Sequence, residues 1–349
     1  DLQTLADSVR RFAAERVAPG FLARHKSRDL DRQLLAEMGE LGFICPELPE
    51  PFGGLGMGCL AAGVIHEEIA RGDLSFSYLN LLASLNAQIL SKYGAPAVVG
   101  PWLKKLVAGK AICAIALTEP RGGSDAANLR LRIERDGEHD VINGEKTSIS
   151  AADQADICVV FGRTGTPASG AHGVTALPVD MRTPGITTNR FDCHGQRAIG
   201  RGSIFFESVR VPASHRLGDE NKGFVQVMHG FDFPRSLIGL QCLAVARVAL
   251  EETWACITQR QAFGQPLSAP AAARRHGCRR LVRHRRRGLP ECPGLRAHQR
   301  PQQGREHPRR RERAGVRDRG PALQASGHCP GGSASGRRPT AHRSRSRRA

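Results

Sequence analysis

The chain has 349 residues and a formal charge of +18, long enough for two or three domains with a sizeable core. The charge is confined to one end: residues 270–349 hold 23 arginines, no lysine and 4 acidic residues, whereas residues 1–269 hold 28 basic and 29 acidic residues. No apolar run approaches the ~18 residues that span a bilayer, so we expect no membrane contact. The ten cysteines include no CxxC pair, and no metal site is predicted.

The cysteines also indicate a compartment. Cys113, Cys158 and Cys242 lie among apolar residues and are predicted to be buried. Free buried thiols are typical of a reducing, cytoplasmic setting. The chain begins at Asp1 with no methionine and no signal-like segment, and we expect a short N-terminal piece to be missing.

Residues 1–109 are predicted to form an all-helical domain. Leu5, Val9, Phe12 and Val17 recur at helical spacing. Proline and glycine mark residues 45–58 as a loop. Glu67 and Glu68 are expected to pair with Arg71 on a helix surface. The predicted helices cover about 2–18, 31–41, 59–71, 75–93 and 96–108.

Residues 110–220 switch to short alternating segments, which predict a separate β-barrel or sandwich domain. The expected strands are 112–117, 141–143, 157–161, 174–179 and 203–206. The expected turns are 136–140, 143–145 and 183–185.

Residues 221–269 are predicted to begin a further helical domain. Asp232 is the expected N-cap of a long helix, with Pro234 in its first turn and its end near Gln259. Apolar residues occur on most sides of this helix, so it needs partners to cover it.

The segment 114–128 (AIALTEPRGGSDAAN) stands out for its chemistry. A buried strand ends there in a turn with Gly122 and Gly123, flanked by short polar side chains. Such a turn brings backbone N–H groups close to a phosphate or a flat ring. Alone, the segment also fits an ordinary strand followed by a polar turn.

Five motifs in order then resemble the acyl-CoA dehydrogenase family of flavoenzymes over residues 1–269. They are PELPEPFGGLGMG, ALTEPRGGSDAAN, VINGEKTSIS, FFESVRVPASHRLGDENKGF and RQAFG. Two further stretches, DLSFSYLNLLASLNAQIL and FDFPRSLIGLQCLAVARVALEETWA, look most like family members that act on cyclohexanecarboxyl-CoA. The resemblance implies an α+β fold, with an N-terminal helical domain, a central β-barrel domain and a C-terminal helical bundle that is incomplete here.

The resemblance also implies a reaction. In this family a carboxylate removes the α-proton of an acyl thioester while the β-hydride passes to N5 of FAD. An electron-transfer flavoprotein or a similar acceptor then takes the electrons, and the enzymes form homo-oligomers, dimers or tetramers.

Site residues follow from the matching motif positions. The implied FAD-binding residues are Ile115, Ala116, Leu117, Thr118, Gly123, Ser124, Ser148, Ile149, Ser150, Arg260 and Phe263. Ser150 would lie near the flavin N5 edge, and Arg260 and Phe263 would hold the FAD of a neighbouring subunit. The implied substrate-binding residues for acyl-CoA are Ser124, Asp232 and Arg235.

The chain departs from the family at three places. Ser148 stands where most members have an aromatic residue against the flavin, and Asn128 replaces a small residue. Most members carry the catalytic glutamate in a Glu-Gly-Thr-like stretch that residues 270–349 lack. A second group has it on the long helix, where this chain has Pro234. Asp232 and Glu251 are acidic and on that helix, but no catalytic base is assigned.

The tail, residues 270–349, contains no Lys, Asn, Ile, Met, Phe, Tyr or Trp. The missing types mostly have A- or T-rich codons, a pattern expected of GC-rich DNA read in the wrong frame. One hypothesis is therefore a frameshift near Ala269. The alternative is a disordered Arg-rich arm, which would bind phosphate backbones through charge. Because the tail has no aromatics, specific nucleic-acid recognition is not expected.

Three functions remain open at this point. The first is an FAD-dependent acyl-CoA dehydrogenase, inactive as written because the base region is missing. The second is a catalytically dead remnant that still binds flavin or CoA. The third is non-specific nucleic-acid binding through the basic tail.

Overall fold

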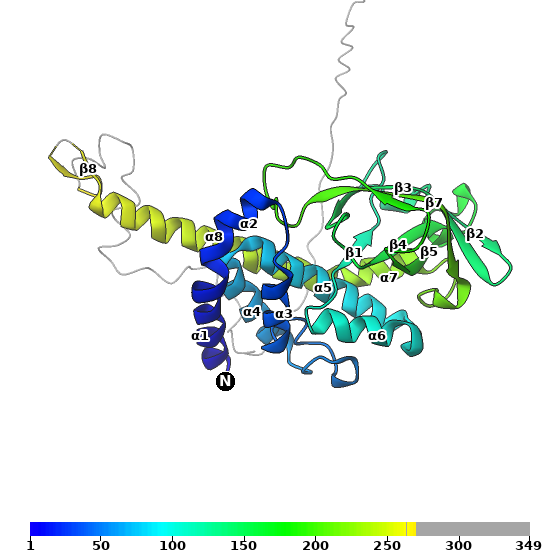
Figure 1. Ribbon diagram of the computed structural model, residues 1–349, viewed down its shortest axis with the longest axis horizontal. Coiled ribbons are helices and arrows are strands. Elements are labelled where there is room, and N and C mark those ends of the chain that lie inside the picture. Colours follow the sequence, from blue (N-terminus) through cyan, green and yellow to red (C-terminus); the bar gives the residue numbers. More distant parts are fainter. Residues whose placement is uncertain (263, 270–349) are drawn as a thin grey trace, which may run out of the picture. The chain divides into compact units, whose positions relative to one another are not determined.

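The computed structural model describes residues 1–262 and 264–269, which belong to one compact unit (Figure 1). Phe263 and the Arg-rich tail, residues 270–349, lie outside the described residues. The frameshift hypothesis and the assignment of Phe263 to FAD therefore stay predictions.

The N-terminal part is helical, as predicted. Helix α1 (Leu2–Phe12) continues through a π-helical turn (Ala13–Val17) and a 3₁₀ turn (Ala18–Gly20) into α2 (Phe21–Ser27). The remaining helices are α3 (Arg32–Glu40), α4 (Cys59–Gly72), α5 (Leu74–Tyr93) and α6 (Pro96–Val107). Aspartates cap three of them, because their carboxylates accept the N–H groups left free in the first turn. These caps are Asp1 on α1, Asp31 on α3 and Asp73 on α5.

The middle part is a seven-stranded sheet in the order β1-β4-β2-β3-β7-β6, with β5 paired to β4. Its strands are β1 (Cys113–Ala116), β2 (Arg132–Asp136), β3 (His139–Ser150), β4 (Ile157–Arg163), β5 (Val174–Asp180), β6 (Ile186–Thr188) and β7 (Arg201–Pro212). β1 runs parallel to β4, and the long strands β3 and β7 pair antiparallel. The α+β fold predicted from the sequence is confirmed.

One predicted turn, 143–145, was wrong. Asn143, Gly144 and Glu145 lie inside β3, which is twice irregular against β7, between Ile142 and Gly144 and between Lys146 and Ile149. Gly144 has φ +136°, a conformation open to glycine, so the chain bulges there instead of turning back. Strands β2 and β6 were also missed by the sequence pattern.

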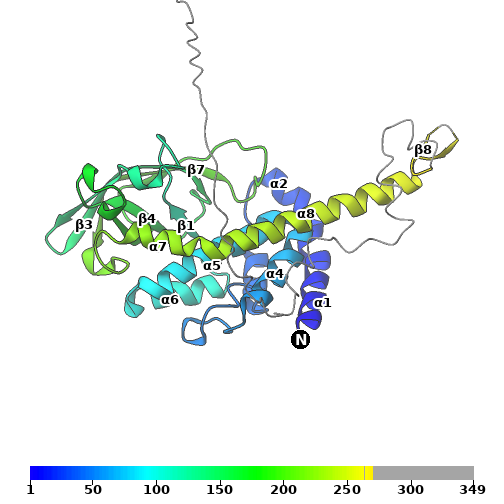
Figure 2. The same cartoon turned by 180° about the vertical axis from the view of Figure 1, so that it is seen from behind.

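Helices α7 (Gly223–Gly230) and α8 (Asp232–Gln259) follow the sheet, and a short hairpin of β8 (Gln261–Ala262) and β9 (Gln265–Pro266) comes after them. The N-cap of α8 is Phe231, not Asp232; Asp232 is already helical and pairs with Arg235. α8 packs along α4 and α5 (Figure 2). Its buried side chains are Pro234, Leu237, Gln241 and Ala244.

Much of α8 remains uncovered, as the sequence predicted for a helix without its partners. Leu243 is 62% exposed and Leu250 is 59% exposed. Cys242, predicted to be buried, is exposed on the same helix. Within the described residues, Gly223–Gln259 is long and apolar enough to cross a membrane by length and composition, which differs from the prediction of no such run. A single helix of this kind is weak evidence for a membrane span, because core helices of soluble proteins pass the same test.

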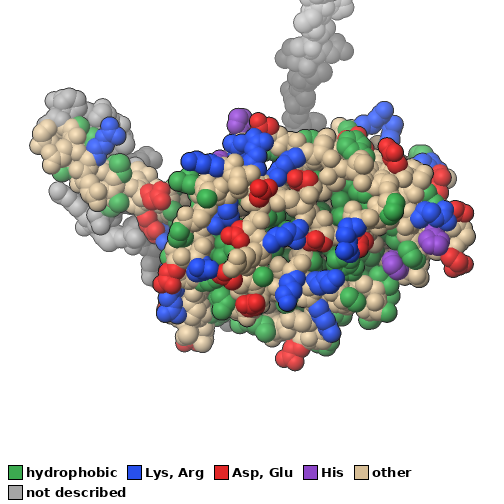
Figure 3. Space-filling model, in the orientation of Figure 1, with side chains coloured by type: hydrophobic (Ala, Val, Ile, Leu, Met, Phe, Trp, Pro, Cys, Tyr) green, Lys and Arg blue, Asp and Glu red, His purple; other side chains and the backbone are tan. Residues whose placement is uncertain are grey.

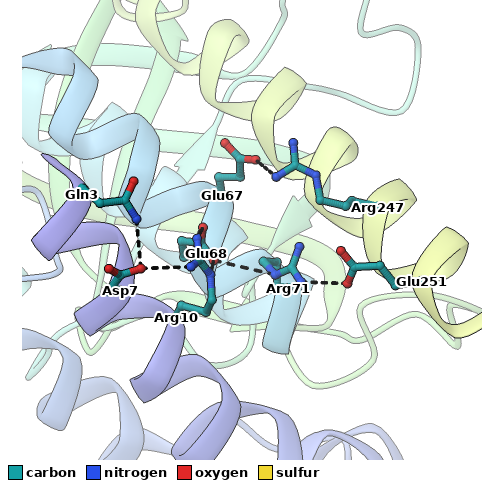
Figure 4. Close-up of polar contacts among 8 residues, drawn as sticks. All are labelled: Gln3, Asp7, Arg10, Glu67, Glu68, Arg71, Arg247 and Glu251. Atoms are coloured by element: carbon teal, nitrogen blue, oxygen red, sulfur yellow. Dashed lines mark hydrogen bonds and ion pairs between the residues drawn. The ribbon is translucent and has the colours of Figure 1, made fainter. Parts of the chain in front are cut away.

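Ion pairs tie α1, α4 and α8 together (Figure 4). Glu68 pairs with Arg71 at 3.7 Å, as expected, but it is buried and not at the surface. It also accepts two hydrogen bonds from Arg10 of α1, at 3.0 and 2.6 Å. Arg71 reaches Glu251 of α8 at 2.8 Å, and Glu67 pairs with Arg247 of α8 at 3.1 Å. Basic and acidic side chains are interspersed over the face in Figure 3, in keeping with the balanced charge of residues 1–269.

Candidate functional site

Strand β3 holds the end of β1 by two contacts. The Thr147 N–H donates to the Thr118 carbonyl at 2.9 Å. The Lys146 Nζ donates to the Leu117 carbonyl at 3.0 Å. Two motifs that the sequence singled out, 114–128 and 142–150, therefore form one surface. We call the part made by residues 115–124 and 146–150 the shelf.

Glu119 closes the loop that follows β1. Its side chain accepts the N–H groups of Arg130 at 2.7 Å and Leu131 at 2.9 Å. It also forms a 2.8 Å ion pair with Lys146. The loop between these anchors includes Gly122–Asp125, which are exposed. Sequence reasoning assigned no role to Glu119 or Lys146.

The two glycines of the loop have different surroundings. A Cβ added at Gly123 would lie 3.3 Å from Thr118 Cγ2, a tight contact, whereas nothing lies within 4 Å of one at Gly122. A small cavity of about 80 Å³ is lined by Leu117, Glu119, Gly122 and neighbouring residues of this loop. The backbone of the loop is thus open to a ligand that side chains would block.

Hydroxyl groups gather beside the shelf. Ser150 Oγ lies 3.4 Å from the Tyr78 hydroxyl of α5, and Thr147 Oγ1 accepts from Ser203 at 2.9 Å. Ser148 lies in the bulge of β3, is exposed and has φ +57°. Tyr78 was not predicted as a site residue. Its signal in the sequence is faint, since an aromatic residue on an apolar helix is ordinarily a core residue.

The predicted cofactor residues divide by the direction of their side chains. Ala116 and Ile149 lie in the core of the sheet. Ile115 and Leu117 are partly buried and pack toward the helical core instead. Ala116 and Ile149 therefore have only their backbone to offer a ligand, while Thr118, Ser124, Ser148 and Ser150 are at least partly exposed.

The remaining predicted residues are not tied to the shelf by the contacts of the described residues. Asp232 and Arg235 form a pair at 3.0 Å on the surface of α8. Arg260 follows the last residue of α8, and its backbone bonds to Cys256 and Leu267. Glu251 is taken by Arg71, and Pro234 is buried.

A larger cavity of about 430 Å³ lies elsewhere, lined by His25, Arg71, Asp73, Val245, Glu252 and their neighbours. It includes none of the predicted site residues.

Three family models match the chain in succession. They are the N-terminal domain of acyl-CoA dehydrogenase over residues 1–110, the middle domain over 114–209 and the C-terminal domain over 221–284. The probable acyl-CoA dehydrogenase YngJ of Bacillus subtilis is 34% identical over 270 residues, which are 76% of this chain and 71% of that protein. The chain belongs to the acyl-CoA dehydrogenase family. Its members are FAD-dependent oxidoreductases, and the predicted recognition is confirmed.

Other similar proteins are also acyl-CoA dehydrogenases. Cyclohexane-1-carbonyl-CoA dehydrogenase of Geobacter metallireducens is 31% identical over 270 residues, covering 76% of this chain and 70% of that protein. A glutaryl-CoA dehydrogenase of Mycobacterium smegmatis, solved in complex with FADH2, matches with a TM-score of 0.73 and 29% identity over 80% of this chain and 71% of that one. The match spans 61% to 71% of the length of several curated relatives, so part of the family's length has no counterpart here. The C-terminal match reaches residue 284, past Ala269, where the resemblance was predicted to end.

Proposed function

We propose that this chain binds FAD on the shelf and an acyl-CoA thioester beside it, in the manner of an acyl-CoA dehydrogenase. The observation that carries the proposal is the pair of contacts from Lys146 and Thr147 to Leu117 and Thr118. They bring the two family motifs into one surface with exposed glycines and hydroxyl groups.

The shelf fits a flavin. A flavin ring presents several nitrogen and oxygen atoms at its edge, which need both donors and acceptors. Thr118, Ser150 and the loop backbone supply both, and the tight space at Gly123 excludes a larger side chain. When bound, FAD would accept the β-hydride of the acyl group. Ser148 would leave more room against the ring than an aromatic residue.

The chain's own residues would bind and orient the substrate. Ser124 is exposed on the loop and would meet the thioester arm of CoA. Asp232 and Arg235 lie together near the start of α8, where a charged CoA would enter. Orienting the thioester against the flavin is a large part of the catalytic task.

Proton abstraction lacks a candidate among the described residues of the shelf. Glu119 is the buried carboxylate there, and it is held by Lys146 and two backbone N–H groups. Glu251 is held by Arg71 on another part of α8. We propose that the chain as written binds flavin but turns over slowly or not at all.

Several further properties belong to the same proposal. A cyclohexanecarboxyl-CoA substrate is supported by the relative from Geobacter metallireducens. A homo-oligomer is supported by the exposed leucines of α8, which need cover. We also propose a cytoplasmic location and an electron-transfer flavoprotein or similar acceptor, on the free cysteines and the family respectively.

The experiment is a flavin titration of the soluble full chain, followed by anaerobic addition of cyclohexanecarboxyl-CoA and, separately, of a linear acyl-CoA. We expect FAD to bind and the flavin absorbance to bleach little. Rapid bleaching would contradict the missing base, and absence of FAD binding would overturn the whole proposal.

A further inference from the structure

We propose that Lys146 is a positioning residue for the flavin. Through its bonds to Leu117 and Glu119 it fixes the peptide group between Leu117 and Thr118, so that the Thr118 N–H faces the ligand side of the shelf. This inference rests on the proposed function and assigns a task to a residue outside the predicted site.

Lys146 is buried without any exposure, which is rare for a lysine unless it is paired. Its Nζ lies 2.8 Å from Glu119 Oε1 and 3.0 Å from the Leu117 carbonyl oxygen. Burial lowers the pKa of Lys146 to about 8, against the opposing effect of Glu119. An apolar residue would fill this place without that electrostatic cost.

The direction of the peptide group follows from its geometry. The peptide bond between Leu117 and Thr118 is trans, so its carbonyl and its N–H point in opposite directions. Since the Leu117 carbonyl points at the Lys146 ammonium group, the N–H of Thr118 points away from that group. The Thr118 carbonyl is held in turn by the Thr147 N–H at 2.9 Å.

Glu119 connects Lys146 to the loop that carries Gly122 and Gly123. It accepts the N–H groups of Arg130 and Leu131, eleven and twelve residues further along the chain. Lys146 therefore stabilises the carboxylate that closes the loop carrying Gly123 and Ser124. Without the cation, Glu119 keeps its two backbone hydrogen bonds but becomes a buried carboxylate with no neutralising charge, which weakens the closure of the loop.

The chain contains a matched control away from the shelf. Arg24 of α2 bonds to the carboxylate of Asp73 at 3.0 Å and also to the carbonyl of Val17. The two side chains are 8% and 2% exposed. This pair has the same composition as the Lys146 pair, namely a buried cation, a carboxylate and a backbone carbonyl, but it lies among the N-terminal helices.

The test measures the dissociation constant of FAD by flavin fluorescence, together with the visible flavin spectrum and the thermal midpoint, for the full chain. The variants are Lys146→Met, Lys146→Met with Glu119→Gln, and Arg24→Met. We expect Lys146→Met to weaken FAD binding by at least about tenfold, or 1.4 kcal/mol, and to shift the spectrum. Arg24→Met should lower the thermal midpoint but leave the affinity of the folded protein within about twofold.

The double variant keeps the inference testable if Lys146→Met fails to fold. Gln at position 119 keeps one side-chain oxygen, which can accept one of the two N–H groups that Glu119 binds, those of Arg130 and Leu131, and it leaves no buried charge. We expect it to fold and to bind FAD about tenfold more weakly than the unaltered chain. Unaltered affinity and spectrum in the double variant would overturn the inference while leaving the proposed function standing. Failure of the unaltered chain to bind FAD would overturn both.

Discussion

Gln241 of α8 donates a 2.9 Å hydrogen bond to the hydroxyl of Ser77 on α5, and both side chains are almost fully buried. Ser77 in turn donates to the backbone carbonyl of His66 on α4 at 2.7 Å. One serine thus joins the three helices that meet in the helical core. The hydroxyl is the central member of this chain of bonds, and its removal has different consequences from removal of the glutamine.

Ser77→Ala should cost more than Gln241→Leu. The alanine leaves the buried Gln241 amide without this acceptor, which costs about 1–3 kcal/mol in unfolding free energy. The leucine removes a polar group and leaves Ser77 bonded to His66, so its cost should be about 1 kcal/mol or less. Urea unfolding of the two variants measures the difference. Equal costs would show that Gln241 does not depend on the Ser77 hydroxyl as its acceptor.

His66 should make stability depend on pH. Its ring is fully buried, Nδ1 bonds to the Ala62 carbonyl, and burial lowers its pKa to about 4. The unfolded chain, with an ordinary His pKa of about 6.5, takes up a proton first on acidification. The unfolded state therefore binds more protons between these values, and stability falls as the pH drops from about 6.5 to about 4.

The matched variant is His66→Leu, which removes the titrating group. Its unfolding free energy should vary less with pH across that window than the unaltered chain's, by up to about 3 kcal/mol. Urea unfolding at several pH values between 4 and 7 gives both slopes. Parallel curves would show that His66 is not the group responsible.

The exposed face of α8 should bind a hydrophobic dye and promote aggregation. Leu243 and Leu250 are each more than half exposed, and covering a leucine contributes about 1.5–3 kcal/mol. Leu243→Glu with Leu250→Lys should reduce dye fluorescence and light scattering without lowering the thermal midpoint. As the control, Leu237→Ala, at a buried position, should lower stability by about 2–5 kcal/mol. Unchanged light scattering in the double variant would show that the chains aggregate through another surface.

The ion pairs between the helices should contribute unequally. Glu68 is buried and bonds twice to Arg10, whereas Glu251, with a side chain 55% exposed, bonds once to Arg71. Glu251→Gln should change the unfolding free energy by about 1 kcal/mol or less. Glu68→Gln should cost more, about 1–3 kcal/mol, because a buried charge-assisted pair is lost. Salt titration of both unfolding curves checks this, and a larger effect at Glu251 would refute it.

The sequence predicted the helices well because their apolar periodicity is strong, and α8 ends at Gln259 as expected. It failed at residues 143–145, where Asn and Gly favour a turn locally but pairing with β7 makes a bulged strand. Lys146 falls four residues after the buried Ile142, and this even spacing is that of two residues on the same face of a regular strand. The alternation fails only afterwards, because β3 is irregular between Lys146 and Ile149 and both of these residues are buried.

The candidate site, too, was predicted from the sequence only in part. The motifs identified the shelf, yet the residues that hold it together, Glu119 and Lys146, were not recognised from the sequence. A charged residue in a polar segment is ordinarily solvated, and only the three-dimensional contact reveals the pairing. The carboxylates Asp232 and Glu251 shared a helix with Pro234, but their salt bridges are with Arg235 and Arg71.

The most direct test of the account is FAD affinity in the Gly123→Val variant, measured beside the unaltered chain and Gly195→Ala. The valine would crowd Thr118, since even its Cβ lies 3.3 Å from Thr118 Cγ2, whereas nothing lies within 4 Å of a Cβ at Gly195. We predict at least about tenfold weaker FAD binding for Gly123→Val alone, with thermal midpoints that stay similar. Equal FAD affinity in all three proteins would contradict the placement of the flavin on the shelf.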